Sequence, residues 1–180
     1  MSIAARSVGV FIISGLLLSA APSVAQESKS AALAAELCKL LDDNKLDSIA
    51  AKQSDDQYVG ALYFPGTQLL VVKGKFGSKA RMAHLLENKE FREVYMDLSG
   101  ASEQQTRVFV MDLGANGLRF RREGNQPFDT ADVGPKSFRF DGEWSKAKIS
   151  ENDYRKTFTD TDEEYAGMLQ ALIGALKKPS

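Results

Sequence analysis

Hydrophobic residues recur at helical spacing near the start of the chain. Residues 29–42 are rich in Ala and Leu, and four leucines there form one apolar stripe: Leu33, Leu37, Leu40 and Leu41. Both residue types favour helix. The pattern predicts an N-terminal helix over 29–42, and a shorter helix is expected from Leu46 to Lys52.

The same helical spacing returns at the other end of the chain. Apolar side chains recur every three or four residues from Tyr165 to Leu176, and Thr161 with Glu164 fits a capping box before them. Ser150 and Asp153 fit an earlier capping box. We therefore expect a short helix over about 151–158 and a separate amphipathic helix that ends the domain.

Between the helical ends, β-branched and aromatic residues dominate. Residues 58–64 and 68–76 flank Pro65-Gly66, the pair that a type II turn requires. The two segments are predicted to form a hairpin. Because both faces are apolar around Leu69 to Val72, the hairpin should lie in the covered centre of a sheet.

The remaining elements follow from shorter patterns. Residues 78–90 are typical of a helix, with Ser78 as a candidate cap, and Val94 to Leu98 alternate as a strand would. Asn116-Gly117 favours a tight hairpin turn. The strands expected from there onward are residues 107–113, 118–122, 128–133 and 137–141.

Together these elements indicate an α+β domain. The expected sheet is mostly antiparallel, or a partly closed barrel, and is built from hairpins. It carries an N-terminal helix, one inserted helix and an amphipathic C-terminal helix.

The first residues have the pattern of a secretory signal. Arg6 precedes an apolar run from Val8 to Leu18, and Ser23 and Ala25 supply small side chains for cleavage before Gln26. The alternative is an uncleaved anchor, but this run is shorter than the ~20 residues of a membrane-spanning helix. We expect residues 1–25 to be removed and 26–180 to form a single domain that is exported, to the periplasm or beyond the cell.

Composition limits the available partners. Loss of Arg6 would move the formal net charge from −1 to −2, so the chain has no overall attraction to nucleic acid or anionic membranes. A single cysteine, Cys38, precludes an intrachain disulfide. No stable membrane span is expected after processing, and a homodimer remains open.

Few chemistries have the residues that they need. The chain has one histidine, His84, and one cysteine, Cys38, so no zinc pattern exists. We interpret His84 as a solvated helix residue, with a general base as the alternative. Cys38 borders a leucine stripe, where a thiol behaves as a small hydrophobe. No nucleophile-elbow, Walker A or dinucleotide-binding motif occurs.

Acidic residues recur near the ends of expected strands: Asp97, Asp112, Asp129, Asp141 and Glu143. Paired carboxylates can hydrolyse glycosides, so a carboxylate-dependent hydrolase is one alternative. Their spacing along the chain does not show whether any two converge, and acids at turns and strand ends are the simpler interpretation.

Arginines cluster on the strand expected after Asn116-Gly117. Arg119 and Arg121 would share one face of it, and Arg122 would lie on the other beside Phe120. A solvated sheet edge is one interpretation. The other is an anion site, since Arg favours phosphate and carboxylate. A second basic group could join it: Lys73, Lys75, Lys79 and Arg81.

The order of elements over residues 29–123 resembles the FMN-binding split-barrel superfamily, the pyridoxamine-phosphate-oxidase-like proteins. The local match is "HLLENKEFREVYMDL", similar to that family's short helix followed by a core strand. The resemblance implies a dimer that binds flavin phosphate, with Lys73, Lys75 and Arg81 as candidate ligands. The first turn departs from the family, since "FPGT" lacks the usual acidic residue.

These observations favour a non-catalytic function. We expect an exported domain that binds a small anionic ligand or a partner in the cell envelope, with no nucleic acid. An FMN-binding flavoprotein and a carboxylate-dependent hydrolase are the alternatives.

Overall fold

The computed structural model describes residues 28–54, 57–75, 91–99 and 108–178. The predicted signal, the expected helix over 78–90, and with it Arg81 and His84, lie outside these residues. The described elements are α1 (Ser30–Asp43), β1 (Ser48–Lys52), β2 (Gln57–Phe64), β3 (Gln68–Lys75), α3 (Phe91–Ser99), β4 (Val108–Leu113), β5 (Asp129–Val133), β6 (Lys136–Phe140) and α4 (Glu151–Lys177). The α+β class is confirmed.

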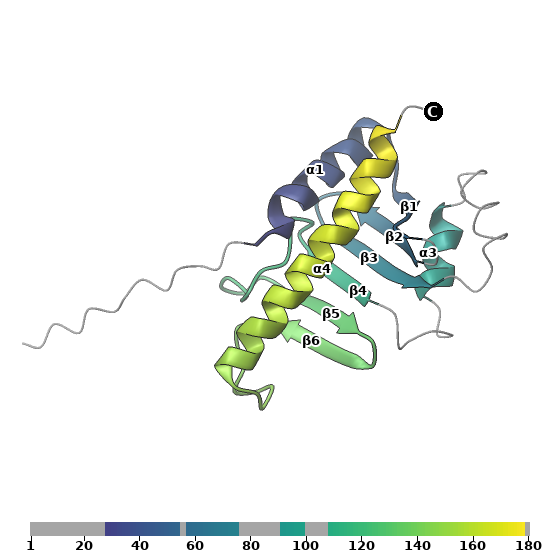
Figure 1. Ribbon diagram of the computed structural model, residues 1–180. Coiled ribbons are helices and arrows are strands. Elements are labelled where there is room, and N and C mark those ends of the chain that lie inside the picture. Colours follow the sequence, from purple (N-terminus) through teal and green to yellow (C-terminus); the bar gives the residue numbers. More distant parts are fainter. Residues whose placement is uncertain (1–27, 55–56, 76–90, 100–107, 179–180) are drawn as a thin grey trace, which may run out of the picture.

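The strands form one open antiparallel sheet in the order of the chain (Figure 1). The predicted hairpin is present as β2 and β3, joined by a turn in which Gly66 has a φ of +67°. Val71 pairs with Ala61 of β2 and with Val110 of β4. This hairpin therefore lies inside the sheet, as its apolar faces predicted.

Helices cover the two faces of the sheet unequally. α1 and the long α4 pack against each other and against one face, where Leu37, Leu41, Leu69 and Leu172 are fully buried. α3 lies on the opposite face over β1, β2 and β3, where Val94 and Tyr95 are buried. Figure 1 shows α4 running diagonally across the sheet beside α1.

The short helix expected from Leu46 to Lys52 is wrong, because Ser48–Lys52 is strand β1. Ile49 and Ala51 pack in the core with α1 and α4, whereas Ala50 packs with α3. Burial on both faces and pairing with β2 outweigh the helical preference of the alanines.

The strand expected over Val94 to Leu98 is also wrong, because Phe91–Ser99 is helix α3. The buried side chains Val94 and Tyr95 are adjacent in sequence, and Phe91 packs with them. Apolar positions separated by three and four residues are typical of a helix. The alternation of Val94, Met96 and Leu98 that suggested a strand covers only five residues, which is too short a stretch to separate the two patterns.

The two C-terminal helices are one continuous helix. α4 has 27 residues, and its N-cap is Ser150, whose side chain accepts a hydrogen bond from the Asp153 backbone N–H. The first predicted cap is confirmed. The second is wrong, because Thr161 is buried in mid-helix and no residue there stops the helix.

Candidate functional site

Residues 114–122 do not form half of a hairpin. β4 ends at Leu113 and pairs next with β5, which begins at Asp129, so the hairpin predicted from 107–113 and 118–122 is wrong. The chain instead turns at Gly114–Gly117 and passes the start of α1. This segment begins at two buried carboxyl groups and ends at a cleft, and its three arginines have three different environments.

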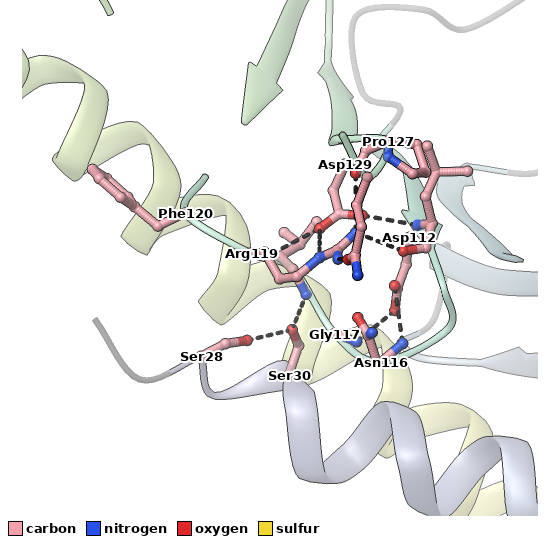
Figure 2. Close-up of polar contacts among 12 residues, drawn as sticks. Ser28, Ser30, Asp112, Asn116, Gly117, Arg119, Phe120, Pro127 and Asp129 are labelled. Carbon is pink, nitrogen blue, oxygen red and sulfur yellow. Dashed lines mark hydrogen bonds and ion pairs between the residues drawn. The ribbon is translucent and has the colours of Figure 1, made fainter. Parts of the chain in front are cut away.

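Asp112 anchors the start of the segment. Its side chain is fully buried and accepts hydrogen bonds from the backbone N–H groups of Asn116 and Gly117, at 3.1 and 2.8 Å (Figure 2). The hydroxyl of Tyr165 on α4 donates a third, at 3.0 Å. Asp112 therefore ties the turn after β4 to α4.

Asp129 holds the next part of the segment. This buried carboxylate accepts from the backbone N–H groups of Leu113 and Arg119, both at 2.8 Å, and from the Arg119 Nε at 3.3 Å (Figure 2). The Arg119 guanidinium also donates to the Leu113 carbonyl at 2.8 Å. Arg119 is thus committed to an internal ion pair that shapes the segment.

The first turn of α1 forms the other support. Asp162 of α4 is buried and accepts from the Ser28 and Ser30 hydroxyls, at 2.8 and 2.6 Å, and from the Lys29 backbone N–H. Ser30 in turn accepts from the Leu118 N–H at 2.9 Å (Figure 2). No sequence pattern pointed to Asp162, because its role depends on α1 and α4 lying together.

Burial raises the pKa of Asp112 to about 6, and the nearby charge of Asp129 adds to this effect. Three hydrogen bonds from Asn116, Gly117 and Tyr165 act in the opposite direction. Burial also raises the pKa of Asp129, against the lowering effect of Arg119. Both side chains have an exposed fraction of 0%, so this convergent pair is out of a substrate's reach and does not fit the hydrolase alternative.

The pKa of Asp112 predicts how stability depends on pH. A folded-state pKa of about 6 against 3.8 unfolded means that the folded chain binds more protons between these values. The contribution of Asp112 is then fully present below pH 4 and falls by about 2 to 3 kcal/mol by pH 7. Urea unfolding at pH 4 and 7 should show this fall in the wild type relative to Asp112→Asn. A constant difference between the two proteins would contradict it.

A cleft of about 480 Å³ opens where the segment ends. The residues that line it come from the segment between β4 and β5, from β6, from the connection into α4 and from the first turns of α4. Figure 1 shows β6 leading into α4 at this end of the sheet. Its lining residues are Arg122, Phe128, Ser137, Phe138, Arg139, Phe140, Asp141, Glu143, Lys146, Ala147, Ile149, Tyr154 and Thr157.

The charged side chains of the lining are paired with one another. Glu143 lies 3.6 Å from the Arg122 guanidinium and also forms an ion pair with Lys146. Arg139 lies 3.8 Å from Asp141. Three cations face two carboxylates, which leaves the lining with a formal charge of +1. The cleft is therefore suited to a ligand that carries negative charge.

Aromatic rings supply most of the apolar wall. The Arg139 guanidinium lies 4.3 Å from the centre of the Phe128 ring, a cation–π contact. Tyr154 packs edge-on against Phe140 at 6.1 Å. Its hydroxyl accepts from the Gly142 N–H and donates to the Phe120 carbonyl, and burial raises its pKa to about 12. Tyr154 is therefore a neutral wall residue.

Of the five predicted anion-binding residues that the structure describes, only Arg122 lines the cleft. Arg119 pairs with Asp129 and Arg121 is exposed outside the lining. Lys73 pairs with Glu164, in the middle of α4, and Lys75 is exposed at the end of β3. Arg81 lies outside the described residues.

Sequence reasoning missed two cationic residues of the cleft, Arg139 and Lys146. Arg139 stands in the alternating stretch "SFRF" and Lys146 just after Trp144, but neither pattern separates them from ordinary surface charges. Among the acids noted from the sequence, Asp141 and Glu143 do line the cleft.

Cys38 has the character of a core residue. Its thiol is buried and lies 3.7 Å from the Ala115 carbonyl oxygen. Burial, with the charges of Asp112 and Asp42, raises its pKa to about 11. A nucleophilic thiolate would require a lowered pKa.

No family model matches the chain, and the searches found no similar curated protein or solved structure. Within the ranges described above, no group of three or more His, Cys, Asp or Glu side chains lies close enough together to hold a metal ion. Over the same ranges, no helix has both the length and the apolar character needed to cross a membrane.

Proposed function

We propose that this chain is a non-catalytic binding domain, exported by its N-terminal segment, that takes a small anionic ligand in the cleft of Arg122. The observation that carries the proposal is the combination of aromatic walls with a surplus of positive charge in one concave site. Small-molecule sites are typically clefts of this size, with apolar walls and a few polar groups that fix orientation.

The proposal does not require a reactive group. Arg122, Arg139 and Lys146 carry charge that can pair with a ligand, and each already lies near a carboxylate. The two carboxyl groups whose pKa is raised by burial lie outside the lining. Binding therefore accounts for the features of the cleft.

The fluorescent dye anilinonaphthalene sulfonate, an aromatic anion, tests the proposal. We expect the dye to bind the purified protein at one site, and Arg122→Ala to weaken it about two- to fivefold, because a partly exposed ion pair contributes up to ~1 kcal/mol. The matched control is Arg121→Ala, which removes the same charge one residue away and outside the lining. A fluorescence titration measures all three affinities.

Two results would contradict the proposal. One is a protein that does not bind the dye. The other is equal weakening by Arg121→Ala and Arg122→Ala, which would assign the effect to the overall charge of the segment instead of the cleft. Thermal unfolding followed by circular dichroism checks that both variants fold.

A further inference from the structure

We infer that Arg122 and Lys146 form a carboxylate subsite, which Glu143 fills from within the chain, and that the ligand is an aromatic monocarboxylate that replaces Glu143 there. The inference rests on the proposed function and names the ligand class of the same cleft. It is carried by the positions of three charged side chains and by the turn that holds two of them.

Glu143 bridges the two cations unequally. One of its carboxylate oxygens, Oε2, is in an ion pair with Lys146, whereas the other, Oε1, lies 3.6 Å from the Arg122 Nη2. The second distance is beyond hydrogen-bonding range. The fork of donors on Arg122, which suits a carboxylate, is therefore not satisfied by Glu143.

The backbone fixes Glu143 and Lys146 without the Glu143 side chain. The Glu143 N–H donates to Asp141 at 2.9 Å, and its carbonyl accepts from the N–H groups of Lys146 and Ala147, at 3.0 and 3.3 Å. The carboxylate takes no part in these bonds; the Glu143 side chain has an exposed fraction of 30%, although its Oε2 atom is buried. The backbone position of Lys146 therefore does not depend on the Glu143 carboxylate.

The rest of the lining selects an aromatic body with one negative charge. Of the aromatic residues in the lining, Phe128 and Phe138 are partly exposed, whereas Phe140 and Tyr154 are buried, and aromatic pairs stack or meet edge-on favourably. Glu143 supplies one of the two negative charges of the lining, so a ligand with a single carboxylate replaces that charge one for one and keeps the formal charge at +1. A flat ring with a single carboxylate meets both conditions.

Naphthoate and naphthalenemethanol, which share a ring system and differ in charge, are the probes. We expect the wild type to bind naphthoate more tightly. Glu143→Gln should raise the affinity for naphthoate about threefold, because it removes the competing anion. The same substitution should change the affinity for naphthalenemethanol by less than about twofold. The control is Glu151→Gln, an exposed acid at the start of α4 outside the lining. Isothermal titration calorimetry measures the affinities.

Lys146→Met should have the opposite effect: because it removes a cation, it should lower the affinity for naphthoate about threefold. A general loss of folding would lower the affinity of both variants, so opposite changes in the two variants cannot come from misfolding. If Glu143→Gln and Lys146→Met both leave naphthoate unchanged while dye binding still depends on Arg122, the subsite is wrong and the proposed function stands. If neither the dye nor either probe binds, both are wrong.

Discussion

Replacing Asp129 by alanine is expected to lower the free energy of unfolding by about 3 to 5 kcal/mol, the usual loss when one partner of a buried ion pair is removed. The Asp129 carboxylate has an exposed fraction of 0% and Arg119 one of 21%. The substitution leaves the Arg119 guanidinium without its carboxylate and deprives the Leu113 and Arg119 N–H groups of their acceptor. Each of these groups is then left without a partner away from water, which lowers the free energy of unfolding.

Urea unfolding at neutral pH, followed by circular dichroism, measures the effect. The control is Asp132→Ala on the same strand, whose carboxylate accepts an exposed hydrogen bond from Ser137; a loss within about 0.5 kcal/mol is expected there. Similar losses in the two variants would mean that Asp129 contributes no more than a surface acid, and that its network does not hold residues 113–119.

The elements that were predicted correctly are those whose signals are local. The leucine spacing of α1, the spacing of α4 and the Pro65-Gly66 turn each lie within one element or one connection. The elements that were wrong depend on partners far along the chain. β1 is a strand because β2 pairs with it and helices cover both of its faces, and Ser48–Lys52 carries no sign of that.

The Asn116-Gly117 signal shows the same limit at the site. These residues do form a turn, and Gly114 and Gly117 have φ angles of +105° and +89°. The turn, however, presents its N–H groups to Asp112 instead of closing a hairpin. The next strand, β5, begins only at Asp129, where its first residue completes the pair of buried carboxyl groups.

The sequence predicted the kind of ligand that the cleft suits, an anion, but not the residues that line the cleft. Arginine in this stretch suggested an anion site, and Arg122 does reach a cleft. Its neighbours in space, Arg139 and Lys146, come from β6 and from the connection into α4. That convergence requires the order of the strands and the docking of α4, which no single stretch of the chain encodes.

Replacing Gly117 by alanine should lower the free energy of unfolding by about 3 kcal/mol or more, through backbone strain and overpacking together. Gly117 has a φ of +89°, and a Cβ atom there would lie 2.4 Å from the Ala31 Cα and 2.6 Å from the Ala31 N. Both atoms belong to the backbone of α1 and cannot rotate away. The loop at Gly114–Gly117 and the first turn of α1 would have to separate, which would stretch the hydrogen bond from the Leu118 N–H to the Ser30 hydroxyl.

Gly124→Ala is the matched control, because Gly124 has a φ of +56° and no atom within 4 Å of a Cβ there. It should show the cost of the left-handed backbone alone, about 1 kcal/mol. Urea unfolding of both variants separates that cost from the steric one. Equal losses would show that the loop and α1 move apart freely, and α1 would then contribute nothing to the placement of residues 118–122, whose last member lines the cleft.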